Sequence, residues 1–309
     1  MRRGVNAAVV GVLALAATLG CSAKRLAVGA VADSLGGAGG GSFASDDDPE
    51  LVRDALPFGL KLQETLLESA PDHRGLLVAT ARGFASYAYL LQDDASRLEA
   101  SDRSGARALQ LRASRLYLRG RDYALRGLEV AHPGFRAEMA SDLPAALART
   151  DRDDAPFLYW AAAGQAGALT ADKGNAELIA DLPRAGAFMD RVLALDESYD
   201  RGAAHEFFIS YEASRPGGSA ARAREHFARA ETLAQGERAS VYVALAEGVS
   251  VQEQNLGEFN ALLDGALAVD VERAPQDRLV NVLSQRRAQW LRDHTGDLFL
   301  DADGTGGAP

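Results

Sequence analysis

The feature that most constrains the fold is a helical hydrophobic pattern that continues from residue 46 to residue 300. Ala and Leu dominate this stretch, and the alternating β-branched runs that are typical of strands are missing. Between residues 51 and 67 the apolar side chains recur with the 3.6-residue period of an amphipathic helix. Pro71 and Asp72 end this run, and the pattern resumes over residues 75–91. The sequence therefore predicts an all-α domain that begins with a helical hairpin.

Residue types that start and stop helices divide the rest of the pattern. Further helical hairpins are expected over residues 106–130, 155–174, 183–212, 220–255 and 257–294. Asp48 suits an N-cap and Pro49 suits the first turn, whereas a calcium loop would need a glycine at its sixth position. The acidic run 151–154 is likewise interpreted as a helix start. Proline is tolerated at helix ends, and four prolines are predicted to lie there: Pro133, Pro144, Pro156 and Pro183.

A weak internal repeat suggests how the hairpins are arranged. The best match to a tetratricopeptide-like (TPR-like) pattern is Ala223-x3-Phe227-x2-Ala230. Equivalent positions begin at Ala185 and Phe259, so the spacing is 36 to 38 residues, slightly above the 34 of a standard repeat. Small residues at these positions let paired helices approach closely. We expect degenerate TPR-like hairpins stacked into a single compact superhelical domain, with a concave face for a partner or ligand.

The amino terminus has the layout of a secretory signal. Arg2 and Arg3 precede an uncharged run over residues 4–20, which ends at Cys21, the one cysteine of the chain. This pattern predicts a lipoprotein signal peptide over residues 1–20, with Cys21 lipidated as the first mature residue. A plain cleaved signal and a retained anchor are the alternatives, although the run is short for a membrane helix of about 20 residues. In a bacterium with two membranes, Ser22 favours transport to the outer membrane.

The remaining segments complete the predicted organisation. Residues 21–45 are small and rich in glycine, with five glycines among residues 36–41. Such a segment is costly to order and is expected to be a tether. It lacks the Gly-Lys-Ser/Thr sequence of a phosphate-binding loop. The helical-repeat domain is placed at residues 46–300, and residues 301–309 are expected to form a flexible tail.

Charge limits the partners of the domain. The net charge is −10, and removal of Arg2 and Arg3 with the signal peptide leaves about −12. An acidic protein is a poor partner for nucleic acid or for anionic lipid. We therefore expect no nucleic acid, and membrane contact through the acyl anchor alone. With Cys21 lipidated, no thiol remains for a disulfide.

No sequence motif makes a positive case for an enzyme. His205-Glu206 begins like a zinc-protease helix, but Ile209 occupies the position of the second histidine ligand. Nucleophile elbows, dinucleotide loops and Walker motifs are missing from the sequence. Most carboxylates are expected to cap helices or to face water. The sequence predicts a non-enzymatic protein with no catalytic residues, no metal site and no cofactor.

Aromatic residues are the candidate ligand contacts. They cluster on the predicted second helices of hairpins, and core packing is the alternative role for each. Adjacent aromatic residues point about 100° apart on a helix, so one of each pair is expected in the core and the other in a groove. If an apolar passage exists, the residues predicted to line it are Tyr87, Tyr159, Trp160, Phe207 and Tyr211.

Six runs, in order, resemble a known family. The chain is similar to the T component (TatT family) of tripartite ATP-independent periplasmic (TRAP) transporters. The likeness covers the signal and nearly all of residues 43–300. One departure is the small-residue stretch 161–164, where the family leads us to expect another bulky aromatic side chain. The runs that carry the resemblance are SDDDPELVRDALP (45–57), LYLRGRDYA (116–124), LYW (158–160), GAAHEF (202–207), REHF (224–227) and RRAQWL (286–291).

The resemblance implies a function as well as a fold. It implies a periplasmic TPR-like lipoprotein that forms a homotrimer and engages the P component, an extracytoplasmic solute-binding protein. It also implies a channel in each protomer, which passes a hydrophobic ligand to the cleft of the partner. The expected function is that of a non-enzymatic accessory protein in solute uptake, anchored to the inner leaflet of the outer membrane. The alternative is a TPR-like scaffold lipoprotein for envelope or pilus assembly. A hydrolase is a third and more distant alternative, which would need a polar cleft with acids of perturbed pKa.

Overall fold

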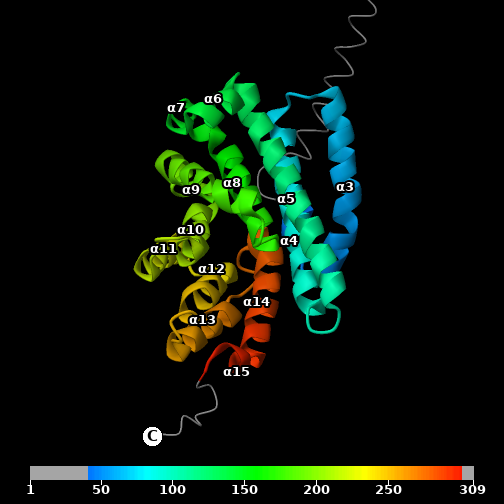
Figure 1. Ribbon diagram of the computed structural model, residues 1–309. Coiled ribbons are helices and arrows are strands. Elements are labelled where there is room, and N and C mark those ends of the chain that lie inside the picture. Colours follow the sequence, from blue (N-terminus) through cyan, green and yellow to red (C-terminus); the bar gives the residue numbers. More distant parts are fainter. Residues whose placement is uncertain (1–40, 301–309) are drawn as a thin grey trace, which may run out of the picture.

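The computed structural model describes residues 41–300, in which all regular secondary structure is helical (Figure 1). This confirms the predicted fold class. The expected signal peptide, Cys21, most of the tether and the tail at residues 301–309 lie outside the described residues. Within residues 41–300 every helix is too short or too polar to span a bilayer.

Three long helices form the amino-terminal part of the domain. They are α3 (Pro49–Ser69), α4 (Arg74–Leu98) and α5 (Arg103–Ala131), which lie alongside one another in Figure 1. The start of α3 is as predicted, because the Asp48 side chain accepts a hydrogen bond from the Leu51 backbone N–H at 2.9 Å and Pro49 opens the helix. Helices α3 and α4 form the predicted hairpin. The expected hairpin over residues 106–130 is wrong, because this segment, which contains no proline, is the single helix α5 of 29 residues. Residues 155–171 likewise form one helix instead of a hairpin.

The middle of the domain is built around a buried helix. After the short α6 (Phe135–Ser141) and α7 (Leu143–Ala148), the 3₁₀ turn η1 (Arg152–Asp154) leads into α8 (Ala155–Ala171). Asp151 and Asp154 form a capping box there, which confirms the interpretation of this acidic run as a helix start. Ala161 and Ala162 are fully buried. These two residues of the stretch that departs from the family pattern are therefore packing residues, whereas Ala163 lines the cavity described below.

Pro183 corrects the prediction that the four prolines lie at helix ends. Pro144 and Pro156 are at helix starts and Pro133 follows the end of α5, but Pro183 is inside α9 (Ala176–Asp196). A proline inside a helix leaves the carbonyl four residues earlier without its amide donor. That carbonyl belongs to Ile179, whose side chain is exposed, so water can reach this turn of the helix.

The carboxy-terminal part consists of shorter helices. The turn η2 (Tyr199–Arg201) connects α9 to α10 (Ala203–Ser214), which pairs with α11 (Ala220–Leu233). Helix α12 (Ala239–Leu245) runs into the π-helical turn η3 (Ala246–Ser250), and α13 (Leu256–Ala268) follows. The turn η4 (Pro275–Asp277), α14 (Arg278–Asp293) and α15 (Thr295–Leu298) end the domain.

Most of the repeat positions identified in the sequence are buried. Phe227 is partly buried, and the other eight are at most 1 % exposed: Ala185, Met189, Val192, Ala223, Ala230, Phe259, Leu263 and Ala266. The pattern thus marks core positions of the helix pairs. The stacking of these pairs into a TPR-like superhelix stays a prediction.

Helix α14 joins the two ends of the chain. Leu279 and Leu283 on α14 belong to the same hydrophobic cluster as Val52 and Leu56 on α3. The short helix α2 (Gly41–Ala44) lies against the same region, where Arg278 donates a hydrogen bond to the Ser45 carbonyl at 3.1 Å. The last residues of the predicted tether therefore pack on the domain, and the helices enclose a space between them.

Candidate ligand cavity

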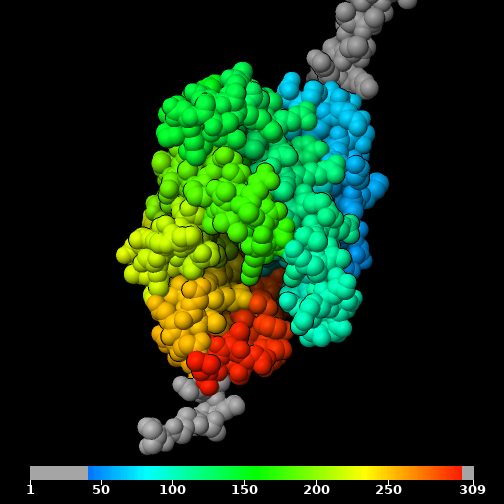
Figure 2. Space-filling model, in the orientation of Figure 1, coloured from blue at the N-terminus to red at the C-terminus, as the bar shows by residue number. Residues whose placement is uncertain are grey.

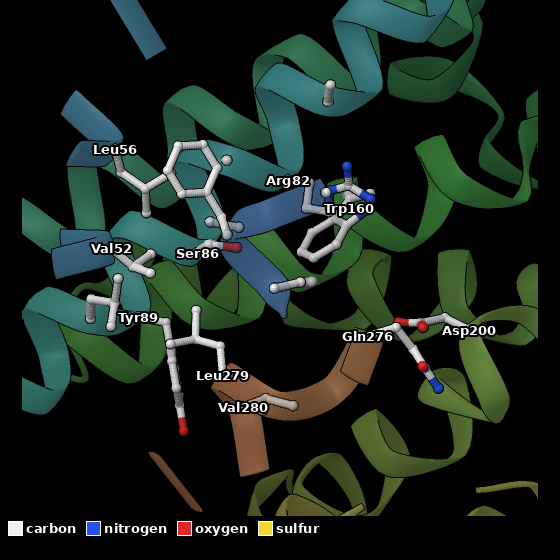
Figure 3. A pocket seen from close by; sticks show the side chains of 18 of the residues that line it. Val52, Leu56, Arg82, Ser86, Tyr89, Trp160, Asp200, Gln276, Leu279 and Val280 are labelled. Carbon is white, nitrogen blue, oxygen red and sulfur yellow. The ribbon is translucent and has the colours of Figure 1, made fainter. Parts of the chain in front are cut away.

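A cavity of about 960 Å³ lies between α3, α4, α8 and α14. This volume is in the upper part of the range for small-molecule sites, about 300 to 1,000 Å³. Figure 2 shows a recess on this face, where the green, cyan and orange-red segments meet. In Figure 3, Arg82 and Trp160 project into the cavity opposite Leu279 and Val280 of α14. Helix α2 contributes to the wall as well.

One part of the wall is apolar. Tyr89 in this wall is 41 % exposed, yet burial raises the pKa of its hydroxyl well above the usual range. Both observations are explained if the exposed surface of Tyr89 faces the cavity. The aliphatic residues of the wall come from α3 and α4 at the start of the described domain and from α14 near its end: Val52, Leu56, Leu60, Val78, Leu90, Leu279, Val280 and Leu283.

Two of the five aromatic residues predicted from the sequence line this cavity. Tyr159 and Trp160 make an edge-to-face contact with ring centroids 5.0 Å apart, and Tyr199 lies 5.3 Å from Tyr159. The expectation that one member of this adjacent pair lies in the core and the other in a groove is wrong. A difference of about 100° in direction is too small to remove either ring from a cavity of this width.

The other three predicted aromatic residues are not among the cavity-lining residues. Tyr87 is 7 % exposed, and its hydroxyl accepts a hydrogen bond from Arg112 at 3.0 Å. Phe207 and Tyr211 stack on each other at 5.5 Å and pack against the core formed by α4, α5, α8 and α9. A ligand contact at any of the five residues stays a prediction.

Charged residues form another part of the wall. Arg238 donates to Asp277 at 2.8 Å and to Asp200 at 3.2 Å, and its distance to the Glu206 carboxylate is 3.6 Å. Burial opposes the charge on Arg238, but the three carboxylates outweigh this effect and raise its pKa. Burial also raises the pKa values of Asp200 and Glu206.

An unusual turn brings Asp200 to this site. Asp200 and Arg201 have φ of 44° and 57°, and Gly202 has φ of 89°, so three consecutive residues are left-handed. Side chains other than glycine rarely adopt this conformation, and such strain is commonly retained at functional sites. Arg201 holds the turn by donating to Asp277 at 3.0 Å and to Glu237 at 2.7 Å.

The sequence interpretation missed this charged cluster. It assigned most carboxylates to helix caps or to solvent, and the continuous helical pattern over residues 183–212 concealed the turn. One usable signal was present, because a glycine after Arg201 is typical of a helix end. The pairing of Arg238 with Asp277 could not be inferred, since these residues are 39 positions apart.

Arg82 differs from Arg238 although both line the cavity. Burial lowers the pKa of Arg82, and the nearby Tyr199 and Asp200 offset this effect in part. Within residues 41–300, Arg82 makes no hydrogen bond or ion pair. It is therefore a largely desolvated cation whose charge has no direct counter-ion in the described domain.

His205 lies in a hydrogen-bonded cluster beside aromatic rings, as predicted. Its Nδ1 is 2.9 Å from Nδ1 of His226, its Nε2 is 3.2 Å from Glu197, and Phe208 stacks on His226. In the part of the chain that the structure describes, no group of three or more His, Cys, Asp or Glu side chains is arranged to hold a metal.

Comparison with known sequences identifies the family. A sequence model described as TRAP transporter T-component matches residues 45–299, almost the whole described domain. The chain belongs to the TRAP transporter T-component family. It is also 32 % identical over 303 residues to an uncharacterised protein of Treponema pallidum (strain Nichols), and this match covers 91 % of the chain and 94 % of the relative.

Membership in this family gives the protein an accessory role in a TRAP transport system. This family is one of transporter components rather than of enzymes. The resemblance that the sequence motifs indicated is thereby confirmed at the level of the family.

Proposed function

We propose that this T component binds the solute-binding P component of a TRAP transporter and holds a hydrophobic small ligand during its transfer. The cavity carries this proposal, because aliphatic side chains from α3, α4 and α14 form a continuous wall next to Tyr159 and Trp160. Burial of apolar ligand surface against such a wall yields about 25 cal/mol per Å². The energy for transport would then come from separate membrane subunits.

The charged part of the cavity supports binding rather than catalysis. Asp277 is held by both Arg201 and Arg238, and Asp200 also pairs with Arg238. Asp277 is thereby committed to a structural ion-pair network rather than left free for chemistry. We therefore propose a non-enzymatic role.

The proposed location follows from the amino-terminal sequence. Lipidated Cys21 would hold the domain in the periplasm, at the inner leaflet of the outer membrane. Several acyl chains together give stable membrane attachment, at about 0.8 kcal/mol per buried CH₂ group. The resulting local concentration favours a homotrimer and repeated encounters with the P component.

Crosslinking in cells tests the partner. The full-length protein, tagged at its carboxy terminus, should be crosslinked to a periplasmic solute-binding protein and to two further copies of itself. Recovery of an envelope or pilus assembly complex without any solute-binding protein would contradict the proposal and favour the scaffold alternative.

A matched pair of variants on α8 tests the cavity. Ala163 lines the cavity, so Ala163→Trp should fill it, whereas Thr170→Trp adds the same ring at an exposed position of the same helix. Native mass spectrometry should detect a small ligand retained by the wild type and by the Thr170 variant, and lost from the Ala163 variant. Equal retention in both variants would exclude the cavity as the binding site.

A further inference from the structure

Arg82 has a position in the cavity that the domain itself does not explain. Its side chain projects from α4 on the same side of the cavity as Trp160 (Figure 3). An arginine that is largely removed from water is costly unless an anion or a set of hydrogen bonds compensates its charge. The described residues supply neither at hydrogen-bonding distance. The missing partner is therefore a group that enters the cavity.

Arg238, the second arginine of the wall, differs from Arg82 because nearby carboxylates balance its charge. Arg238 has Asp277, Asp200 and Glu206 within 2.8 to 3.6 Å. Arg238 forms ion pairs with all three carboxylates, and Asp277 also pairs with Arg201. The same cavity thus contains one neutralised arginine and one whose charge is available to a ligand.

We propose that the cavity takes an amphipathic monoanion, with its head group on Arg82 and its aliphatic body against α3 and α14. This inference rests on the proposed ligand-holding function and specifies the class of ligand. A carboxylate is the best match to the head-group site, because a guanidinium binds it with two parallel charge-assisted hydrogen bonds.

The rest of the cavity wall disfavours an anion with a second charge. The apolar residues Val52, Leu56 and Leu279 would desolvate a charge placed among them. The charged part of the wall already holds Asp200 and Glu206, which would repel another carboxylate. The site therefore distinguishes a monoanion from a dianion of the same length.

Three ten-carbon probes separate these possibilities: decanoate, decan-1-ol and decanedioate. Binding to the purified protein, stripped of endogenous ligand, is measured by calorimetry. Decanoate should bind more tightly than either of the other probes. Arg82→Met should weaken decanoate about 10- to 100-fold, the effect expected for a hydrogen bond to a charged group, and leave decan-1-ol unchanged. The matched control is Arg115→Met, an exposed arginine on α5.

A measurement without ligand shows whether the Arg82 variant is folded. Removal of a partly buried cation without a direct counter-ion should leave the thermal midpoint unchanged or raise it, and Arg82→Lys should keep most of the preference for decanoate. Equal affinity of wild type and Arg82→Met for decanoate would overturn the role of Arg82 while leaving the cavity intact. A large drop in the midpoint of Arg82→Met would also overturn it, by showing a structural partner. Failure of the wild type to bind decanoate and decan-1-ol would overturn the ligand-holding function itself.

Discussion

Arg238 and Asp277 face each other at 2.8 Å, and each side chain is 5 % exposed. The first residue directly precedes α12 and the second directly precedes α14, so their ion pair fixes the starts of two helices relative to each other. Asn281 strengthens this junction, because its buried side chain accepts from the Ala239 N–H and donates to the Glu237 carbonyl. The charged part of the cavity wall thus also holds the starts of α12 and α14 together.

Loss of the ion pair between Arg238 and Asp277 should destabilise the protein. Arg238→Met removes one of the two cations that pair with the buried Asp277, and breaking a buried pair costs about 3 to 5 kcal/mol. Urea unfolding should show this loss. Arg273→Met is the control, because the Arg273 side chain is 70 % exposed and its ion pair with Glu237 is long, at 3.5 Å. This variant should change the free energy of unfolding by less than about 0.5 kcal/mol. Equal stability of the two variants would show that the pair is not structural.

The close approach of α5 and α8 gives a second prediction. A Cβ at Gly164 would lie 2.8 Å from the Tyr117 carbonyl oxygen and 3.1 Å from the Arg121 nitrogen, and backbone atoms cannot rotate away. Gly164→Ala should therefore destabilise the protein by about 1 to 3 kcal/mol, despite the better helix propensity of alanine. Gly174→Ala meets no atom within 4 Å and should be neutral or slightly stabilising. Thermal unfolding of both variants makes the comparison.

Glu64 should make part of the stability depend on pH. This carboxylate is 8 % exposed, accepts hydrogen bonds from Lys61 at 2.7 Å and Tyr123 at 2.8 Å, and pairs with Arg119. Burial alone would raise the pKa of Glu64, but these partners outweigh burial and lower it below the ordinary 4.5. A lowered pKa gives stability that is present above pH 4.5 and is lost as pH falls through the folded-state value.

Unfolding by urea at several pH values tests this sign. Glu64→Gln should be less stable than the wild type by about 1 to 3 kcal/mol at pH 7, and the difference should shrink below pH 4.5. Glu68→Gln, at an exposed position of the same helix, should stay within about 0.5 kcal/mol of the wild type throughout. A difference that grows on acidification would refute the assignment.

The proposed anchor at Cys21 gives a prediction in cells. Cys21→Ser removes the thiol that would carry the lipid, so the variant should not enter the detergent phase on phase separation or incorporate a labelled fatty acid. Wild-type protein should do both. Membrane attachment of the serine variant would point instead to the retained-anchor alternative.

The sequence was most informative about local structure. The 3.6-residue pattern, Asp48 before Pro49 and the acidic residues before Pro156 identified helices and several of their starts, because these signals depend on neighbours within one or two turns. It also marked Ala223 and Phe259 as core positions. The sequence interpretation failed at Pro183, because exposure of the surrounding turn lowers the usual cost of a proline inside a helix. It also failed to predict the turn η2 that follows α9.

Local sequence patterns were enough to specify the all-α class, the buried positions of the repeat and the family motifs. The tertiary structure decided which side chains share the cavity: Tyr159 and Trp160 line it, whereas Tyr87, Phe207 and Tyr211 do not. It also decided that Arg238 is neutralised and that Arg82 is not. Periodicity reports which face of a helix is buried, but the partner of a buried charge is set by helices that meet from distant parts of the chain.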